Sequence, residues 1–249
     1  MSLLLVAAII FTSFLTAAIS SMFGMLGGLI LLAVLVNIMP VGEAMVLHGF
    51  IQLTSNGFRL WLNRQHVQWA IVGFFIIGGV VALSALAFVA FVPSRIMLLM
   101  ALGLMPYLSL IIPKSWALDA TKKPVATLAG GLIVMINLLS GVAGPLLDVF
   151  FQKTALTRHQ VVATKAGVAS LSHVAKIVFF GALVSAGTTW PAPGLLLLAM
   201  LAALIGTRIG KLALDRMNDA LFFTWTQRIL LVLGALLIGR AGFLMLSPA

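Results

Sequence analysis

The stretch "VVATKAGVASLSHVAKIVFFGALV", residues 161–184, places two lysines and a histidine inside a long apolar run. An ammonium group at the centre of a bilayer costs roughly 2.5–3.5 kcal/mol even on lenient scales. If this run crosses a membrane, Lys165 and Lys176 therefore need a partner, water or a ligand. The composition of the whole chain indicates that the run does cross one.

The composition is that of a helical membrane protein. Of 249 residues, 62% are hydrophobic and 8% are charged, whereas soluble domains carry about 25% charged residues. Apolar runs of about 18 or more residues recur, each a candidate transmembrane helix. No basic region precedes the first run, so we expect a retained helix rather than a signal peptide. Breaks rich in Gly, Pro, Asn and charge predict helices at 2–21, 29–38, 42–61, 67–91, 94–112, 124–140, 145–152, 158–183, 192–213 and 219–246.

A shift of 117 positions aligns the chain with itself. In each half, a glycine-interrupted segment precedes a helix with a polar stripe. We therefore predict two homologous halves, 1–118 and 119–249. The residues paired by the shift are Gly24 with Gly141, Gly27 with Gly144, His48 with Lys165, Ser55 with Ser172, Asn56 with His173, and Arg59 with Lys176.

The distribution of basic residues indicates how the halves are oriented. If each half begins with a full span, six basic residues fall on each side of the membrane. If segments 2–38 and 124–152 are instead broken and return to the side they entered, the division is ten against two. This asymmetry predicts inverted repeats, each a glycine-broken, re-entrant-like helix followed by about three transmembrane helices, with both termini outside. A single long tilted helix in place of either broken segment stays open.

The two breaks are candidate parts of a binding site. Secondary transporters with inverted repeats bind substrates near interrupted helices, where half-helix N-termini present a positive dipole end. Glycine also lets the backbone approach a ligand, and free N–H groups can hold an anion. Close helix packing is the alternative role for small residues. The residues of the two breaks are Gly24, Gly27 and Gly28, and Gly141, Gly144 and Pro145.

Two polar stripes complete the candidate site. Lys165, Ser172 and Lys176 lie within about 40° of one another on a helix, with His173 about 60° further round. The first half carries His48, Gln52, Ser55 and Arg59 on one face, with Asn56 beside them.

Acidic residues are scarce, and only Asp148 and Glu43 fall near these stripes. The missing negative charge is therefore predicted to be an anionic substrate, with Lys165 as its main countercharge. The N–H groups around Gly27–Gly28 and Gly144–Pro145 would supply further donors to its oxygens. Simpler roles stay open for several residues: Lys176 and Arg59 could reach the headgroups, and Asp148 could pair with Lys165 or cap a helix. His48 and His173 could join helices or carry protons.

The composition disfavours other classes of function. With no cysteine, the chain has no disulfide, thiolate metal site or cysteine nucleophile. The four histidines are dispersed, so we expect no metal or cofactor. The net charge of +10 lies mostly in short loops, where topology explains it without nucleic acid. An intramembrane enzyme would need a nucleophile or metal, and a scaffold for soluble partners would need a second protein.

Several motifs resemble the TauE/SafE sulfite exporter family over nearly the whole chain. Each half opens with a glycine-rich break, "FGMLGGLILL" at 23–32 and "SGVAGPLLDV" at 140–149. A polar helix follows each, "EAMVLHGFIQLTSNGFRLWL" at 43–62 and "QVVATKAGVASLSHVAKIVF" at 160–179. The turn "HVQW" at 66–69 and the helix "ALIGTRIGKLAL" at 203–214 add to the resemblance. The family usually has a denser GxGGG motif, and both breaks of this chain contain fewer glycines than that motif.

The resemblance implies a function and a location. Such proteins are thought to move sulfite, sulfonates, related sulfur oxyanions or organic acids across the cytoplasmic membrane, often as exporters. We therefore expect a secondary transporter of small anions in a bacterial inner membrane, exporting sulfite or a small organosulfonate by alternating access. Thiosulfate, sulfate or an organic acid are alternative substrates. Membrane lipids surround the protein, which we expect to be a monomer or a homodimer.

Overall fold

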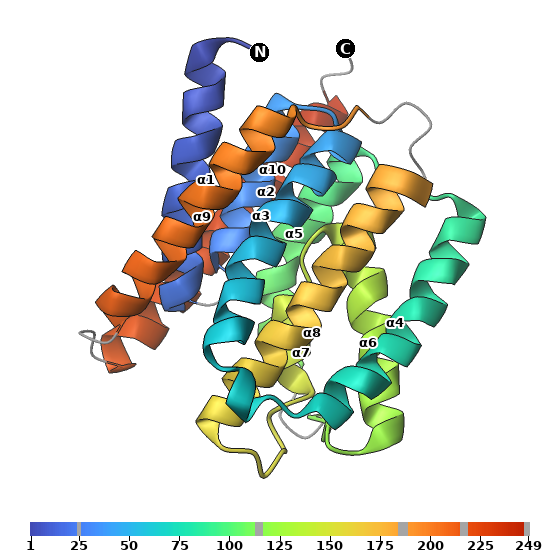
Figure 1. The fold of residues 1–249 in the computed structure, drawn as a ribbon. Helices are drawn as coiled ribbons and strands as arrows, with labels where there is room; N and C mark the ends of the chain where they lie inside the picture. The colour runs from blue at the N-terminus through green and yellow to red at the C-terminus, as the bar shows by residue number, and fades with distance from the viewer. Residues whose placement is uncertain (24–25, 113–116, 184–188, 215–218, 247–249) are drawn as a thin grey trace.

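The computed structural model describes residues 1–23, 26–112, 117–183, 189–214 and 219–246, and no strand occurs among them (Figure 1). The predicted all-α class is confirmed, and most helix bounds lie within a few residues of the expected ones. The elements are α1 (Leu3–Phe23), α2 (Leu26–Ile38), α3 (Val41–Leu62), the 3-10 turn η1 (Arg64–His66), α4 (Trp69–Val89), α5 (Arg95–Ile111), α6 (Lys123–Ser140), α7 (Gly144–Val149), α8 (Arg158–Val178), the π-helical η3 (Phe179–Leu183), α9 (Pro193–Leu214) and α10 (Asp219–Leu246).

Six helical segments in the described chain are long and apolar enough to cross a membrane. They are Leu3–Met22, Trp69–Val89, Lys123–Ser140, Arg158–Ala182, Pro193–Leu212 and Gln227–Leu246. Helices α2 and α5 are apolar but shorter. Helix α3 is not among the six, because its apolar residues are interrupted by the polar stripe from His48 to Arg59.

The break between α6 and α7 occurs at a residue that has to be glycine. Gly141 caps α6 with φ +80°, a left-handed conformation that other residues adopt only with strain. After this turn the chain runs back to where α6 began. The Leu118 N–H donates to the Val149 oxygen at 3.1 Å, and the Ala120 N–H to the Phe150 oxygen at 2.9 Å. Segment 124–152 therefore ends beside its own start, while its relation to a bilayer stays a prediction.

The break between α1 and α2 brings two helices unusually close. A Cβ atom on Gly27 would lie 1.8 Å from the Thr16 carbonyl oxygen, so only glycine fits against α1 here. Close approach through small residues is the usual way in which membrane helices associate. Gly27 therefore packs α2 onto α1.

Helices of the two predicted halves pack against each other in matching pairs. Helix α1 packs along α9, and its counterpart α6 packs along α4. Helices α3 and α8 pair with each other, as do α5 and α10. Exchanging the halves reproduces these same pairs, which is what a two-fold relation between them would give. The inverted repeat and the boundary between 118 and 119 stay predictions.

Figure 1 gives the molecule two distinguishable ends. The start of α1 and the end of α10 lie at one end, which we call the far end. The connections after α3, α5 and α7 lie at the opposite end. We call it the basic end, because these connections and the helix starts beside them carry Arg64, Lys122, Lys123, Lys153 and Arg158.

Candidate functional site

A cavity of about 580 Å³ lies between the paired helices α3 and α8. Ligand pockets for small molecules are typically about 300–1,000 Å³. The end of α1, the start of α2, α6 and the start of α7 contribute the remaining walls. The polar residues that line the cavity are Ser20, Ser21, His48, Gln52, Asn56, Arg59, Asn137, Arg158, Lys165, Ser172 and His173.

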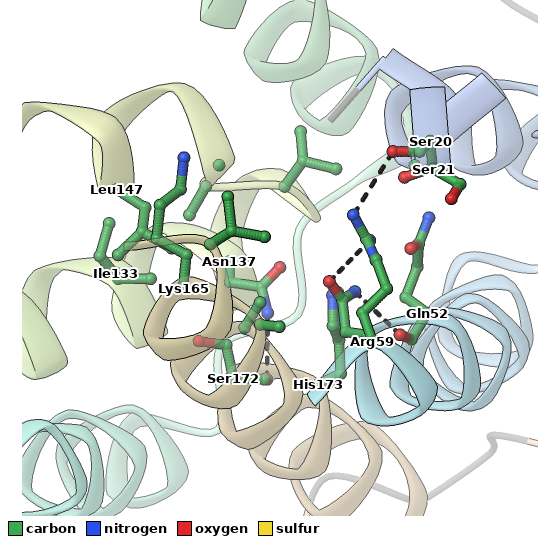
Figure 2. A pocket seen from close by; sticks show the side chains of 18 of the residues that line it. Ser20, Ser21, Gln52, Arg59, Ile133, Asn137, Leu147, Lys165, Ser172 and His173 are labelled. Atoms are coloured by element: carbon green, nitrogen blue, oxygen red, sulfur yellow. Dashed lines mark hydrogen bonds between the residues drawn. The ribbon is translucent and has the colours of Figure 1, made fainter. Parts of the chain in front are cut away.

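The α3 wall presents an arginine held by neutral partners. Figure 2 shows Arg59 and Gln52 projecting from α3 on one side of the cavity. The Arg59 guanidinium donates to the Asn56 side-chain oxygen at 2.8 Å and to the Ser20 carbonyl oxygen at 3.4 Å. No ion pair joins it to an acid among the described residues. The positive charge of Arg59 is therefore not neutralised by the protein around it.

The α8 wall presents a lysine that is already paired. Lys165 forms an ion pair with Asp148 of α7, and their side chains are 29% and 41% exposed. Figure 2 places Lys165 across the cavity from Arg59, beside the apolar side chains of Ile133 and Leu147. Because Asp148 offsets part of the Lys165 charge, Arg59 is the less neutralised of the two cations.

Three buried polar atoms around the cavity have no hydrogen-bond partner among the described residues: Arg59 Nε, Asn137 Oδ1 and His173 Nδ1. Asn137 is held in place by its amide nitrogen, which donates to the Ser172 carbonyl oxygen at 3.0 Å. Buried polar groups in proteins are nearly always hydrogen-bonded. The three residues that carry these unpaired atoms all line the cavity, so its walls contain hydrogen-bonding groups that the described protein leaves unused.

The structure brings most, but not all, of the predicted residues to this cavity. Gln52 has room there because a Cβ on Gly28 would lie 2.6 Å from its amide nitrogen. The predicted residues that line the cavity are Gly28, His48, Gln52, Asn56, Arg59, Gly144, Lys165, Ser172 and His173.

The other predicted residues lie outside the lining. Gly27 packs on α1, and the Ser55 hydroxyl pairs with the Thr207 hydroxyl of α9 at 2.8 Å. Pro145 is buried in α7 and Lys176 is buried beside His48. Gly24 lies outside the described residues. The remaining two are the helix cap Gly141 and the ion-pair partner Asp148.

The lining also contains polar residues that sequence reasoning missed, namely Ser20, Ser21, Asn137 and Arg158. A signal for two of them existed, because the 117-residue shift that pairs the halves also pairs Ser20 with Asn137. Both residues lie near the ends of apolar helices that precede the two breaks. Their position at the cavity follows from how α1 and α6 end against α3 and α8.

The charge of the lining is positive. Arg59, Arg158 and Lys165 contribute cations, and no aspartate or glutamate belongs to the described lining. The described residues also contain no group of three or more His, Cys, Asp or Glu that could hold a metal ion. The cavity therefore favours a small anion.

Comparison with known protein families agrees with this reading. The model of the family described as "Sulfite exporter TauE/SafE" matches residues 9–240. This chain belongs to the TauE/SafE sulfite exporter family. The match covers both predicted halves and every residue of the cavity, and the resemblance seen in the motifs is confirmed. No curated protein and no solved structure matched the chain.

Membership of the TauE/SafE family indicates a membrane protein that transports a small anion. The apolar helices and the positively charged cavity agree with that class.

Proposed function

We propose that this TauE/SafE protein is a secondary transporter that exports sulfite or a small organosulfonate across a bacterial inner membrane. The single observation that supports this most is the charge of the cavity, whose described lining contains three basic side chains and no acidic one. A cation pathway would instead be lined by carboxylates. We assign the chain no enzymatic activity.

Arg59 and Lys165 are the countercharges in this proposal. An arginine presents a planar fork of donors that can hold two oxygens of one oxyanion, and such charge-assisted bonds are the strong ones. Arg59 lines the cavity, and its buried Nε–H has no hydrogen-bond partner among the described residues. Lys165 adds a second positive charge that Asp148 positions. Arg59 is therefore the principal anion ligand and Lys165 the secondary one.

The remaining donors come from side chains and from the start of α2. The first N–H groups of a helix have no partner within it and carry a partial positive charge. Gly28 is in the first turn of α2 and lines the cavity next to Gln52. This corner is suited to an oxygen of the anion. His48, Asn56, Ser172 and His173 add further polar groups to the cavity lining.

The cavity also has an apolar side that suits an organosulfonate. Ile133, Val142 and Leu147 line it together with the cations. A short alkyl group could pack there while the sulfonate oxygens face Arg59. Sulfate, thiosulfate and organic acids share the same charge chemistry, so they are the alternatives.

The proposed topology follows from the positive-inside rule. The basic end faces the cytoplasm and both termini lie outside, so the two predicted halves are inverted and rock about the cavity between them. The protein works as a monomer or a homodimer within the lipid bilayer.

Vesicles reconstituted with the purified protein test this proposal. We expect vesicles loaded with sulfite to lose it faster than protein-free vesicles, and excess organosulfonate to slow the loss by competition. Vesicles that retain sulfite and the other anions while the protein conducts a cation would contradict the proposal.

A further inference from the structure

Lys176 is a buried lysine that does not belong to the described cavity lining. It lies one turn beyond Ser172 on α8, and its exposed fraction is 0%. Its ammonium group contacts His48 Nδ1 at 3.1 Å and donates to the Gly141 carbonyl oxygen. Among the described residues it has no carboxylate partner. Burying an amino group with no carboxylate partner is costly, so a functional reason is needed for its presence.

The partners of His48 fix the direction of the hydrogen bonds around Lys176. His48 Nε2 lies 3.0 Å from the Gly28 carbonyl oxygen, which can only accept a hydrogen bond. His48 Nε2 therefore carries the proton, and Nδ1 of the neutral ring is an acceptor. The Lys176 ammonium donates to that nitrogen.

These bonds connect both glycine breaks through the two central helices. Lys176 on α8 holds Gly141, the cap of α6, and it also holds His48 on α3. His48 in turn holds Gly28 at the start of α2. Of these three contacts, the one between Lys176 and His48 joins the two predicted halves, and the other two tie it to the glycine breaks of each half. Separating the halves there requires the Lys176–His48 bond to break.

The exposure of residues on the cavity side of α8 shows that these three bonds lie at the closed end of the cavity. Near the basic end, Val162 is 47% exposed and the Lys165 side chain is 29% exposed. Further along the cavity, Ser172 and His173 are buried. Beyond Lys176, both Phe179 and Phe180 are buried as well. The cavity is therefore accessible from the basic end and sealed toward the far end.

We propose that Lys176 is the latch of the far gate, the closed region between the cavity and the far end: its bond to His48 keeps the cavity closed toward the far end and breaks when that end opens, while its bond to Gly141 holds the Lys176 side chain in place. The inference rests on the proposed transport function, because a transporter that alternates between two sides needs a gate at each. Lys176 acts through its neighbours, so it is a positioning residue rather than a ligand of the anion in this conformation.

Cysteine labelling tests the latch, since the chain contains no cysteine and any introduced one is unique. Ala44 is the reporter position: it is fully buried and lies one turn beyond His48 on α3, on the far side of the latch. Ala44→Cys is reacted with a membrane-impermeant thiol reagent added from the far end. We expect Lys176→Met to raise the labelling rate about fivefold or more, the factor expected when the one hydrogen bond between the halves is lost.

Two variants of His48 supply a matched control. Glutamine carries one acceptor and one donor, so His48→Gln can retain both bonds, whereas His48→Leu can retain neither. We expect slow labelling of Ala44→Cys with His48→Gln and fast labelling with His48→Leu. A purely structural role for this position would not produce that difference between two variants of similar size.

The outcomes separate the latch from the substrate. Unchanged labelling in Lys176→Met, or equal labelling in the two His48 variants, overturns the latch. If Lys176→Met yields no monodisperse protein, the His48 pair decides alone. A second reporter, Ser172→Cys, lines the cavity and should label equally from the basic end in every background if the fold is intact. No substrate enters the assay, so a failure of sulfite transport does not affect its result.

Discussion

Replacing Arg59 with glutamine should weaken anion transport more than the same change at Lys165. Arg59 makes hydrogen bonds only to neutral groups, whereas Lys165 is already paired with Asp148. A hydrogen bond to a charged group contributes about 1.5–3 kcal/mol. Since about 1.4 kcal/mol is a factor of ten, Arg59→Gln should raise the KM for sulfite by about 10- to 150-fold. Lys165→Gln, made together with Asp148→Asn so that no lone carboxylate is left to repel the anion, should raise it by about tenfold or less.

The effect of Arg59→Gln on folding should be small enough to be distinguished from its effect on transport. Arg59→Gln removes the donors to Asn56 and to the Ser20 carbonyl, and both partners line the cavity. The free energy of unfolding of Arg59→Gln should therefore fall by about 1 kcal/mol. Arg59→Lys keeps the charge but loses the planar fork, so its KM should fall between those of the wild type and Arg59→Gln.

The assay is the initial rate of sulfite loss from reconstituted vesicles over a range of internal sulfite concentrations. The melting temperature of each variant in detergent serves as the folding control. If Arg59→Gln transports normally while Lys165→Gln with Asp148→Asn is inactive, the ranking drawn from the Asp148 ion pair is wrong. If both variants transport normally, the cavity between α3 and α8 is not the substrate site.

Three further changes test the packing around the cavity by thermal melts in detergent. Gly27→Ala should destabilise the protein by about 1–3 kcal/mol or more, because its Cβ would overlap the α1 backbone, while Gly57→Ala, which meets open space, should not. Gly141→Ala should cost about 1–2 kcal/mol through its left-handed backbone, and a normal melting temperature would show that α6 ends differently. Ser55→Ala should cost about 0.5–1.5 kcal/mol by breaking the bond to Thr207, yet leave the KM for sulfite unchanged. A raised KM in Ser55→Ala would instead place its hydroxyl at the substrate.

The helices could be predicted because local chemistry determines them. Apolar runs separated by Gly, Pro and charged residues gave bounds close to those observed, including the interruption at Gly141. The α3 face of the cavity was also predictable, because His48, Gln52, Asn56 and Arg59 are three or four residues apart and so share one side of a helix.

Which polar residues share the cavity depended on tertiary packing. Lys165 and Lys176 lie on one face of α8, but they are about 16 Å apart along its axis. The cavity ends between them, so one lysine lines it and the other is sealed behind His48. The helical period predicts which side of a helix a residue faces, but not how far along the cavity the residue lies. Ser20 and Asn137 reach the cavity because of where α1 and α6 stop, and the ion pair of Lys165 depends on where α7 places Asp148.

The most direct test of an anion site in this cavity is a thermal-shift titration of the purified protein with sulfite, sulfate, thiosulfate, taurine, sulfoacetate and chloride. A ligand that binds only the folded state raises its melting temperature. We predict that a sulfur oxyanion stabilises the wild type, stabilises Lys165→Gln with Asp148→Asn less and leaves Arg59→Gln unchanged. A wild type that responds to none of these anions but is stabilised by a cation would contradict the account.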